Sequence, residues 1–111
     1  MVKYFKLLFV CRNNKMRSYT AEVIYNSECL YSAKSAGTER TARVKVTKDL
    51  LLWADIIFTM EEKQTEYIKN EFIESVRNKK IIVLGIPNNH YFMEPALMKL
   101  ITYKVDPYLV I

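Results

Sequence analysis

Short apolar runs alternate with longer amphipathic stretches along this chain, a pattern typical of β-strands that alternate with α-helices. Four runs have the length and the branched or aromatic residues of buried strands. They are residues 3–10, 31–36, 55–60 and 81–86. Because a helical stretch separates each run from the next, we predict an α/β fold in which four parallel strands are joined by right-handed crossovers.

The stretches between the strands carry apolar residues at helical spacing. Helices are expected at residues 18–26, 48–54, 61–78 and 95–104. Thr47 can cap the second helix, and Pro95 suits the first position of the fourth. The paired acids Glu61 and Glu62 open the third helix and are interpreted as capping residues, not as a catalytic pair. The buried stripe of that helix is expected to consist of Ile68, Phe72, Ile73 and Val76.

Length and composition indicate one globular domain over residues 1–111. Half of the residues are hydrophobic, which is enough for one core, and the small numbers of glycine and proline argue against disorder or a fibrous repeat. Trp53 is expected to pack the second helix on the sheet. The apolar tail, residues 105–111, either adds an edge strand or packs on the core.

The net charge and the cysteines indicate which binding partners and which cellular compartment to expect. A net charge of +5 favours anionic partners such as phosphoryl groups or acidic peptides. Nucleic acid is disfavoured because no aromatic-rich recognition pattern accompanies the charge. Two cysteines, Cys11 and Cys29, make no disulfide framework, so a reducing cytoplasm is the simpler expectation. Neither a signal peptide nor a run of membrane-spanning length is recognised, and no membrane partner is expected.

The residues with the clearest chemical potential follow the first strand. That strand leads into Cys11, and Arg17 and Ser18 stand where the first helix begins. Helix N-termini and cations stabilise a thiolate, which is the nucleophilic form of cysteine. Loop N–H groups can cradle an anion, arginine can hold two of its oxygens, and the Ser18 hydroxyl can donate to the sulfur. This combination suits a tetrahedral oxyanion that is attacked at its centre.

A loop this tight usually needs residues with positive φ, and glycine is absent from it. Asn13 and Asn14 belong to the other residue type that enters the left-handed region readily. Their side-chain amides can also bond the backbone of the loop itself. The two asparagines are therefore expected to shape the loop.

Residues 10–18, Val-Cys-Arg-Asn-Asn-Lys-Met-Arg-Ser, resemble the Cys-x5-Arg-Ser signature of the low-molecular-weight protein tyrosine phosphatases, with Ala21 and Glu22 after it. The resemblance spans most of the chain and points in particular to a short bacterial branch of predicted phosphatases. Its other segments are residues 35–38, 52–57, Met60 and 80–87. It implies a three-layer α/β/α sandwich of the phosphotyrosine protein phosphatase I type, with a four-stranded parallel sheet of order 2-1-3-4.

The resemblance also implies a role for the residues of the loop. Cys11 corresponds to the nucleophile, Arg17 to the phosphate clamp, Asn14 to the loop-shaping residue and Ser18 to the residue that stabilises the thiolate. Substrate contacts are expected from Arg12, Asn13, Asn14, Lys15, Met16 and Ser18.

Two positions depart from the pattern of the family. Asn13 stands where the family usually has glycine, and Met16 stands where it often has a second cysteine. That second thiol commonly protects the nucleophile by forming a disulfide. This chain should therefore lack that protection.

The proton donor for the leaving group is harder to assign. The family uses an aspartate in an Asp-Pro loop, and residues 106–108, Asp-Pro-Tyr, match that motif. The last helix, however, should carry the chain ~15 Å back from the active edge, which puts Asp106 at the far edge. Glu94, directly before Pro95, lies at the active edge and is preferred as the general acid. The competing interpretation is that Glu94 only caps the helix.

Three neighbouring residues bear on the same question. Asn88 and Asn89 follow Ile-Pro, where the resembling branch tends to carry an acid. Amides cannot donate a catalytic proton, so a missing acid at this place predicts a slow or inactive enzyme. His90, the single histidine, either assists proton transfer or is simply solvated.

Ligands of such sheets bind beyond the carboxyl ends of the strands, so the loop after Cys11, the loop at Thr38, residues 60–61 and residues 87–94 should lie at one edge. The segment 38–48 is basic and is either a solvated surface or a rim that attracts an anionic substrate. Its cations are Arg40, Arg43, Lys45 and Lys48.

The leading hypothesis is a phosphotyrosine-type protein phosphatase that hydrolyses phosphate monoesters through a phosphocysteine intermediate. Phosphorylated proteins or small aryl phosphates are the expected substrates, inorganic phosphate is the product, and neither a metal nor a cofactor is expected. The main alternative is a catalytically impaired pseudophosphatase that binds phosphate or phosphoproteins. Arsenate reduction would need more cysteines than Cys29 supplies, and Arg17 and Ser18 weakly favour hydrolysis over a phosphocarrier role.

Overall fold

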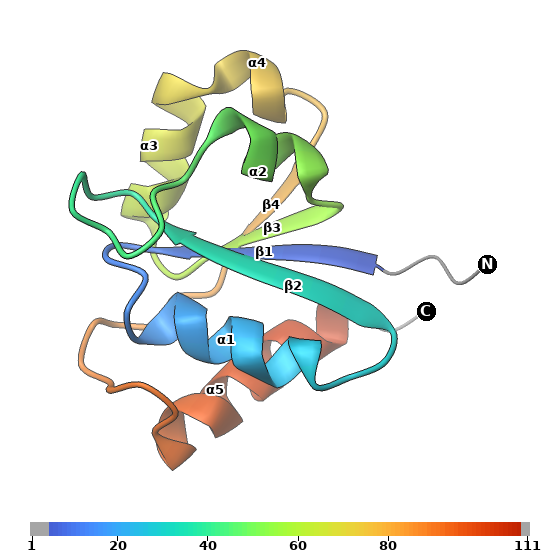
Figure 1. The fold of residues 1–111 in the computed structure, drawn as a ribbon, viewed down its shortest axis with the longest axis vertical. Coiled ribbons are helices and arrows are strands. Elements are labelled where there is room, and N and C mark those ends of the chain that lie inside the picture. The colour runs from blue at the N-terminus through green and yellow to red at the C-terminus, as the bar shows by residue number, and fades with distance from the viewer. Residues whose placement is uncertain (1–4, 110–111) are drawn as a thin grey trace.

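A computed structural model describes residues 5–109 of the chain. Its centre is a four-stranded parallel sheet of order β2-β1-β3-β4, which confirms the predicted fold class and strand order (Figure 1). The strands are β1 (Phe5–Cys11), β2 (Tyr31–Gly37), β3 (Ile56–Thr59) and β4 (Lys80–Val83). The first strand was predicted to begin at Lys3, which lies outside the described residues.

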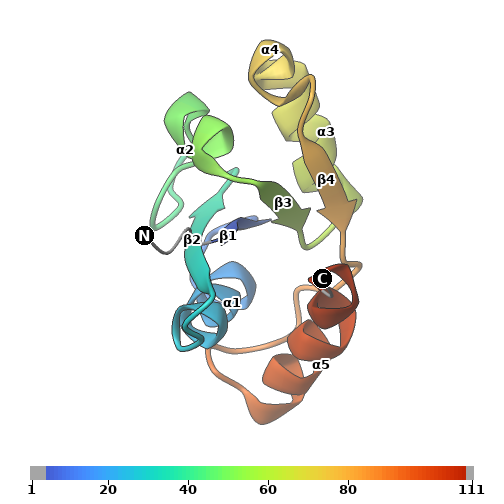
Figure 2. The same cartoon turned by 90° about the vertical axis from the view of Figure 1, so that its right-hand side faces the viewer.

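Helices cover both faces of the sheet (Figures 1 and 2). One face carries α1 (Arg17–Asn26) and α5 (Pro95–Val105), and the other carries α2 (Lys48–Trp53), α3 (Glu62–Glu71) and α4 (Ile73–Val76). Because side chains alternate along a strand, β1 supplies a core to each side. Leu7 and Phe9 pack beneath α1 and α5, and Leu8 and Val10 pack beneath the other helices.

The third predicted helix is interrupted at Phe72, so the expectation of one helix over residues 61–78 is wrong. Phe72 has φ −135° and ψ 36°, which ends α3 and starts α4. The break turns Ile73 outward, where it is 54% exposed, whereas Ile68 and Val76 are buried as predicted. Phe72 is partly buried against the core and packs edge-on against Tyr67.

The fourth strand is shorter than expected because Gly85 adopts φ +70°. The backbone N–H groups of Leu84 and Ile86 still donate to the carbonyls of Thr59, the last residue of β3, and of Met60, and both side chains are buried. The tail forms the short 3-10 helix η1 (Asp106–Tyr108), and Leu109 packs in the core. Of the two expectations for the tail, packing is confirmed as far as Leu109, and residues 110–111 lie outside the described part.

The helix ends follow the predicted local chemistry. The Thr47 side chain accepts a hydrogen bond from the backbone of Leu50 and caps α2. Glu61 and Gln64 form a capping box at the start of α3, which confirms the interpretation of Glu61 as a cap. Trp53 lies at the margin of the core rather than inside it, with Lys34 above its ring. Within residues 5–109, no helix is long and apolar enough to cross a membrane.

The carboxyl ends of all four strands lie at the same edge of the sheet (Figure 1). Cys11 pairs with Gly37 at the end of β1 and β2, and Val10 pairs with Thr59 at the end of β3. The loops that leave these ends therefore meet, as the sequence predicted. They form the candidate site.

Candidate active site

The backbone after β1 curls around the sulfur of Cys11. The Asn14 N–H donates to Cys11 Sγ over 3.2 Å, and Ser18 Oγ lies 2.9 Å from the same sulfur. The Asn14 side-chain amide donates to Ser18 Oγ over 2.7 Å. Ser18 accepts that bond, so its own hydrogen is available for the sulfur or for the more distant Ala36 carbonyl at 3.4 Å. The sulfur is therefore contacted both by a loop N–H group and by a hydroxyl.

Asn14 gives the loop its shape. It is fully buried and adopts φ 59°, the left-handed conformation expected for the asparagines. Asn13 is not in that conformation, so only one of the two asparagines has the predicted geometry. The Asn14 Oδ1 atom is buried without a hydrogen-bond partner within the described residues. The hydrogen bond of the Asn14 amide group within residues 5–109 is therefore the one that its nitrogen donates to Ser18.

Arg17 is the most deeply buried charged side chain of the site. Its Nη1 donates to Glu61 Oε1 and to the Ile86 carbonyl, each over 2.8 Å. Its Nε and Nη2 make no hydrogen bond to residues 5–109, and Arg17 lines the cavity that holds Cys11. The remaining donors of the guanidinium are thus positioned for an oxyanion. Its hydrogen bond to Glu61 is the largest influence on that carboxyl and lowers its pKa below the usual 4.5. Burial acts in the opposite direction, and the charge of Arg17 lowers the pKa further.

Exchange of Glu61 for glutamine should remove a pH-dependent part of the stability. Because the pKa of Glu61 is lowered in the folded state, its contribution is fully present above 4.5 and is lost as the pH falls through the lowered value. The difference in free energy of unfolding between wild type and Glu61→Gln should therefore be constant near neutral pH and shrink in acid. Urea unfolding over a pH series measures it.

The control for this series is Glu62→Gln, which alters the neighbouring exposed carboxylate of α3. Glu62 makes no ion pair within the described residues, so its exchange should leave the pH dependence unchanged. If the difference in free energy of unfolding between wild type and Glu61→Gln did not vary with pH, Glu61 would act only as a helix cap.

Two adjoining cavities open at this edge of the sheet. The first, of about 240 Å³, is lined by Cys11, Asn13, Asn14, Lys15, Met16, Arg17 and Asn88. The second, of about 400 Å³, is lined by Arg12, Thr38, Glu39, Glu61, Lys63, Gln64 and Asn88. Of the predicted contact residues, Arg12 therefore faces the second cavity, and Ser18 is buried beneath the loop. Asn88 belongs to both.

Arg43, in the basic segment 38–48, forms hydrogen bonds with the Cys11 loop, a role that sequence reasoning missed. The backbone of Arg43 bonds the Asn13 carbonyl and its Nε bonds the Asn14 carbonyl, each over 3.0 Å. Its guanidinium lies 3.6 Å from the centre of the Tyr19 ring. Lys45 donates to the Thr38 carbonyl within the segment. Arg40 and Lys48 are exposed, as expected for a solvated surface.

The acids considered as proton donors lie away from the Cys11 cavity. The Glu94 carboxylate is 2.5 Å from His90 Nδ1 at the start of α5, and neither residue lines the two cavities. Asp106 accepts a hydrogen bond from Tyr25 at the far end of α1, over 2.6 Å. Burial and this bond raise the pKa of Tyr25. Glu94 as general acid stays a prediction.

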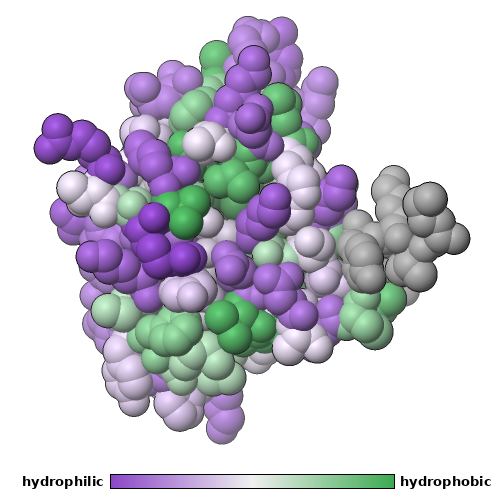
Figure 3. Space-filling view, in the orientation of Figure 1, coloured by the Kyte–Doolittle hydropathy of each residue, from purple (hydrophilic) through white to green (hydrophobic). Residues whose placement is uncertain are grey.

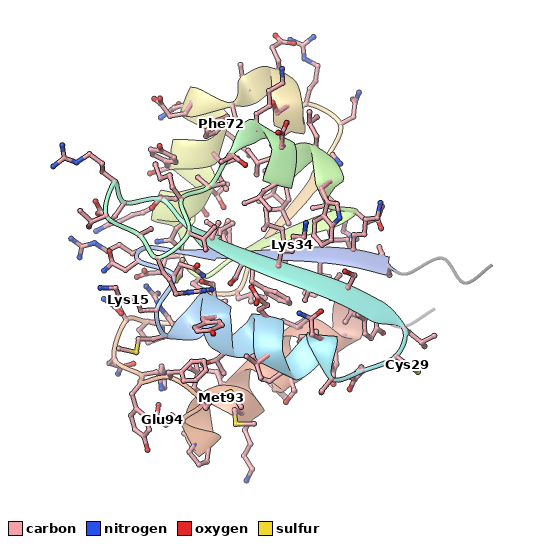
Figure 4. The ribbon with its side chains drawn as sticks, in the orientation of Figure 1. Lys15, Cys29, Lys34, Phe72, Met93 and Glu94 are labelled. Carbon is pink, nitrogen blue, oxygen red and sulfur yellow. The ribbon has the colours of Figure 1, made fainter. Side chains whose placement is uncertain are left out.

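The second cysteine is remote from the first. Cys29 is exposed beyond the end of α1, and Figure 4 shows it at the opposite end of that helix from Lys15. Met16 is 40% exposed at the rim of the Cys11 cavity. The chain thus brings no second thiol to the nucleophile.

Neither a family model nor a curated protein matches the sequence. Solved structures do match the fold of this chain. Wzb from Vibrio vulnificus, solved with benzylphosphonate, aligns with a TM-score of 0.72 and 20% identity over 96% of this chain and 97% of that one. A low-molecular-weight protein tyrosine phosphatase from Streptococcus pyogenes gives 0.72 and 18% over 95% and 91%.

A third structure carries a different specificity. The YwlE arginine phosphatase from Geobacillus stearothermophilus aligns with a TM-score of 0.68 and 17% identity, over 95% of this chain and 92% of that one. All three alignments cover nearly the whole chain, and the strand order is the one expected from the resemblance. The chain therefore has the fold of the low-molecular-weight protein tyrosine phosphatases.

Proposed function

We propose that this protein is a cysteine-dependent phosphatase that hydrolyses phosphate monoesters of the phosphotyrosine type. One observation carries the proposal: the sulfur of Cys11, held by two donors, and the guanidinium of Arg17 line the same small cavity. A thiolate and a planar cation around one tetrahedral anion suit attack on phosphorus. Two of the structural neighbours are an arginine phosphatase and a tyrosine phosphatase, which supports the same class of reaction.

The chemistry has two steps. The Cys11 thiolate attacks phosphorus, an S–P bond forms, and the bond from phosphorus to the leaving oxygen breaks. Water then attacks the phosphocysteine, the S–P bond breaks, and inorganic phosphate and the thiolate are released. In both steps the guanidinium of Arg17 and the loop N–H groups stabilise charge on the equatorial oxygens.

An aromatic substrate also fits the surroundings of the cavity. Figure 3 shows apolar side chains gathered over α1 and the neighbouring loop, below a band of polar residues at the sheet. Met16, which lines the cavity, and Phe92 are both exposed, and Phe92 packs against Tyr19 of α1 at a ring separation of 4.7 Å. One neighbour was solved with benzylphosphonate, an oxyanion on an aromatic ring. Small aryl phosphates are therefore suitable test substrates.

Exchange of Cys11 for serine should abolish turnover, because a hydroxyl in place of the thiolate removes the nucleophile. The measurement is release of p-nitrophenol from p-nitrophenyl phosphate at mildly acid pH, with acid-quenched mass spectrometry to detect phosphate on Cys11. Wild type should show both the product and the adduct. Equal rates in wild type and Cys11→Ser would rule out the proposed function.

A phosphate-binding module with impaired catalysis is the second candidate. This candidate is favoured by Asn88, because its amide side chain lines the Cys11 cavity where a phosphatase would need a proton donor. Tight binding of vanadate without any turnover that depends on Cys11 would support this candidate over the phosphatase.

A further inference from the structure

Asn88 is the one lining residue of the Cys11 cavity, among the described residues, that comes from outside residues 11–17. It follows β4 and faces both cavities, so it stands beside the opening through which a phosphoryl group and its substituent must enter. An amide can donate a hydrogen bond to a departing oxygen but cannot give up a proton. The lining residue that another segment contributes to this cavity is thus an amide, which can stabilise a leaving anion but cannot neutralise it.

Among the described residues, no carboxyl group lines the Cys11 cavity, and Glu39 of the adjoining cavity is paired with Arg12. Glu94 is paired with His90, and Asp106 is paired with Tyr25 at the far end of α1. Glu61 is the carboxylate next to Arg17. It accepts a hydrogen bond from the Arg17 guanidinium, and this bond keeps the carboxylate ionised. An ionised carboxylate bound to the phosphate clamp is in the wrong protonation state to act as an acid.

We propose that this site acts on phosphoryl groups whose leaving group departs as a stable anion, and that acyl phosphates are its preferred substrate class. The proposal rests on the proposed function and concerns the same Cys11 site. It competes with the prediction that Glu94 is the general acid.

The reason is the basicity of the group that leaves. A carboxylic acid has a pKa of about 4 and a phenol about 10. When Cys11 attacks an acyl phosphate, the S–P bond forms, the P–O bond breaks, and the electron pair departs on a carboxylate that needs no proton at neutral pH. A phenolate would need one, and a general acid typically contributes about 10²–10⁴-fold to such a step. Hydrolysis of the phosphocysteine by water then completes turnover as before.

The test compares acetyl phosphate with phenyl phosphate in the full-length wild type and in Cys11→Ser. After subtraction of the spontaneous reaction, wild type should hydrolyse acetyl phosphate in a manner that depends on Cys11, and phenyl phosphate at least about 10²-fold more slowly. Asn88→Asp places a carboxyl group in the same position and should raise kcat for phenyl phosphate by about 10²-fold, without a gain for acetyl phosphate.

Asn89→Asp is the matched control. It adds the same charge one residue further along, at an exposed position that lines neither cavity, and should bring no gain with phenyl phosphate. Equal turnover of both substrates by wild type would overturn the proposal. So would a selective loss of phenyl phosphate turnover in Glu94→Ala, which would identify Glu94 as the acid. In both cases turnover still depends on Cys11, whereas turnover of neither substrate depending on Cys11 would refute the phosphatase itself.

Discussion

Replacement of Arg17 by alanine is expected to weaken vanadate binding strongly and to destabilise the fold at the same time. Arg17 is 1% exposed, and its Nη1 is the partner of both Glu61 and the Ile86 carbonyl. Truncation leaves a buried void and two acceptors without their donor. Loss of a buried ionic partner and of the side-chain volume should lower the free energy of unfolding by on the order of 3 kcal/mol.

The free energy of vanadate binding should fall by an amount similar to the loss in stability. Two charge-assisted hydrogen bonds from the guanidinium, at about 1.5 kcal/mol each, correspond to a loss of on the order of 100-fold in vanadate affinity. Calorimetric titration and urea unfolding measure the two effects. Arg17→Lys retains the charge but not the planar fork, so it should recover part of the stability and little of the affinity.

The control for the loss of an arginine is Arg77→Ala. Arg77 is exposed and pairs only with Glu74 on the surface of the molecule, so its removal should change stability by less than about 0.5 kcal/mol. Vanadate affinity that survived in Arg17→Ala would show that the cavity binds anions through the backbone alone.

Exchange of Gly37 for alanine is expected to displace the Cys11 loop. A Cβ atom at this position would lie 2.7 Å from the Arg12 carbonyl oxygen and 2.6 Å from Ala42 Cβ. Both distances are shorter than real contacts allow, and the Arg12 oxygen belongs to the backbone that surrounds the sulfur. Such overpacking typically costs about 1–3 kcal/mol. We expect reduced stability together with a loss of vanadate binding, measured by thermal unfolding and calorimetry.

The double variant Gly37→Ala with Ala42→Gly separates the two contacts. It removes the clash with the Ala42 side chain and leaves the one with the Arg12 backbone. Stability should recover in part, while vanadate binding stays weak because the loop is still displaced. Full recovery of binding in the double variant would show that the Arg12 contact does not matter for the site.

The parts of the site that the sequence predicted are those made by residues close together in the chain. Cys11, Asn14 and Ser18 lie within one turn of loop and the start of one helix, so their spacing already fixes which atoms can meet. The strand order followed from the resemblance, and the shared edge of the loops followed from parallel pairing. The caps at Thr47 and Glu61 are local as well.

The parts that sequence reasoning missed depend on contacts between distant segments. The pairing of Arg17 with Glu61 spans 44 positions, and Arg43 reaches Asn14 across 29. Neither contact leaves a periodic signal, and Glu61 was already explained by its capping role. The break at Phe72 was missed for a related reason: the apolar spacing of residues 68–76 fits one helix as well as two, and only the course of the chain over the sheet decides.

Strand β1 is synthesised first, yet it occupies an inner position of the sheet between β2 and β3. The partners of Arg17 lie 44 and 69 positions further along, so Arg17 can make both contacts only after Ile86 has left the ribosome. Until then the nascent polypeptide carries Cys11 without a fixed Arg17 beside it. The cavity that the two residues share is therefore completed only when most of the chain has been synthesised and has folded around β1.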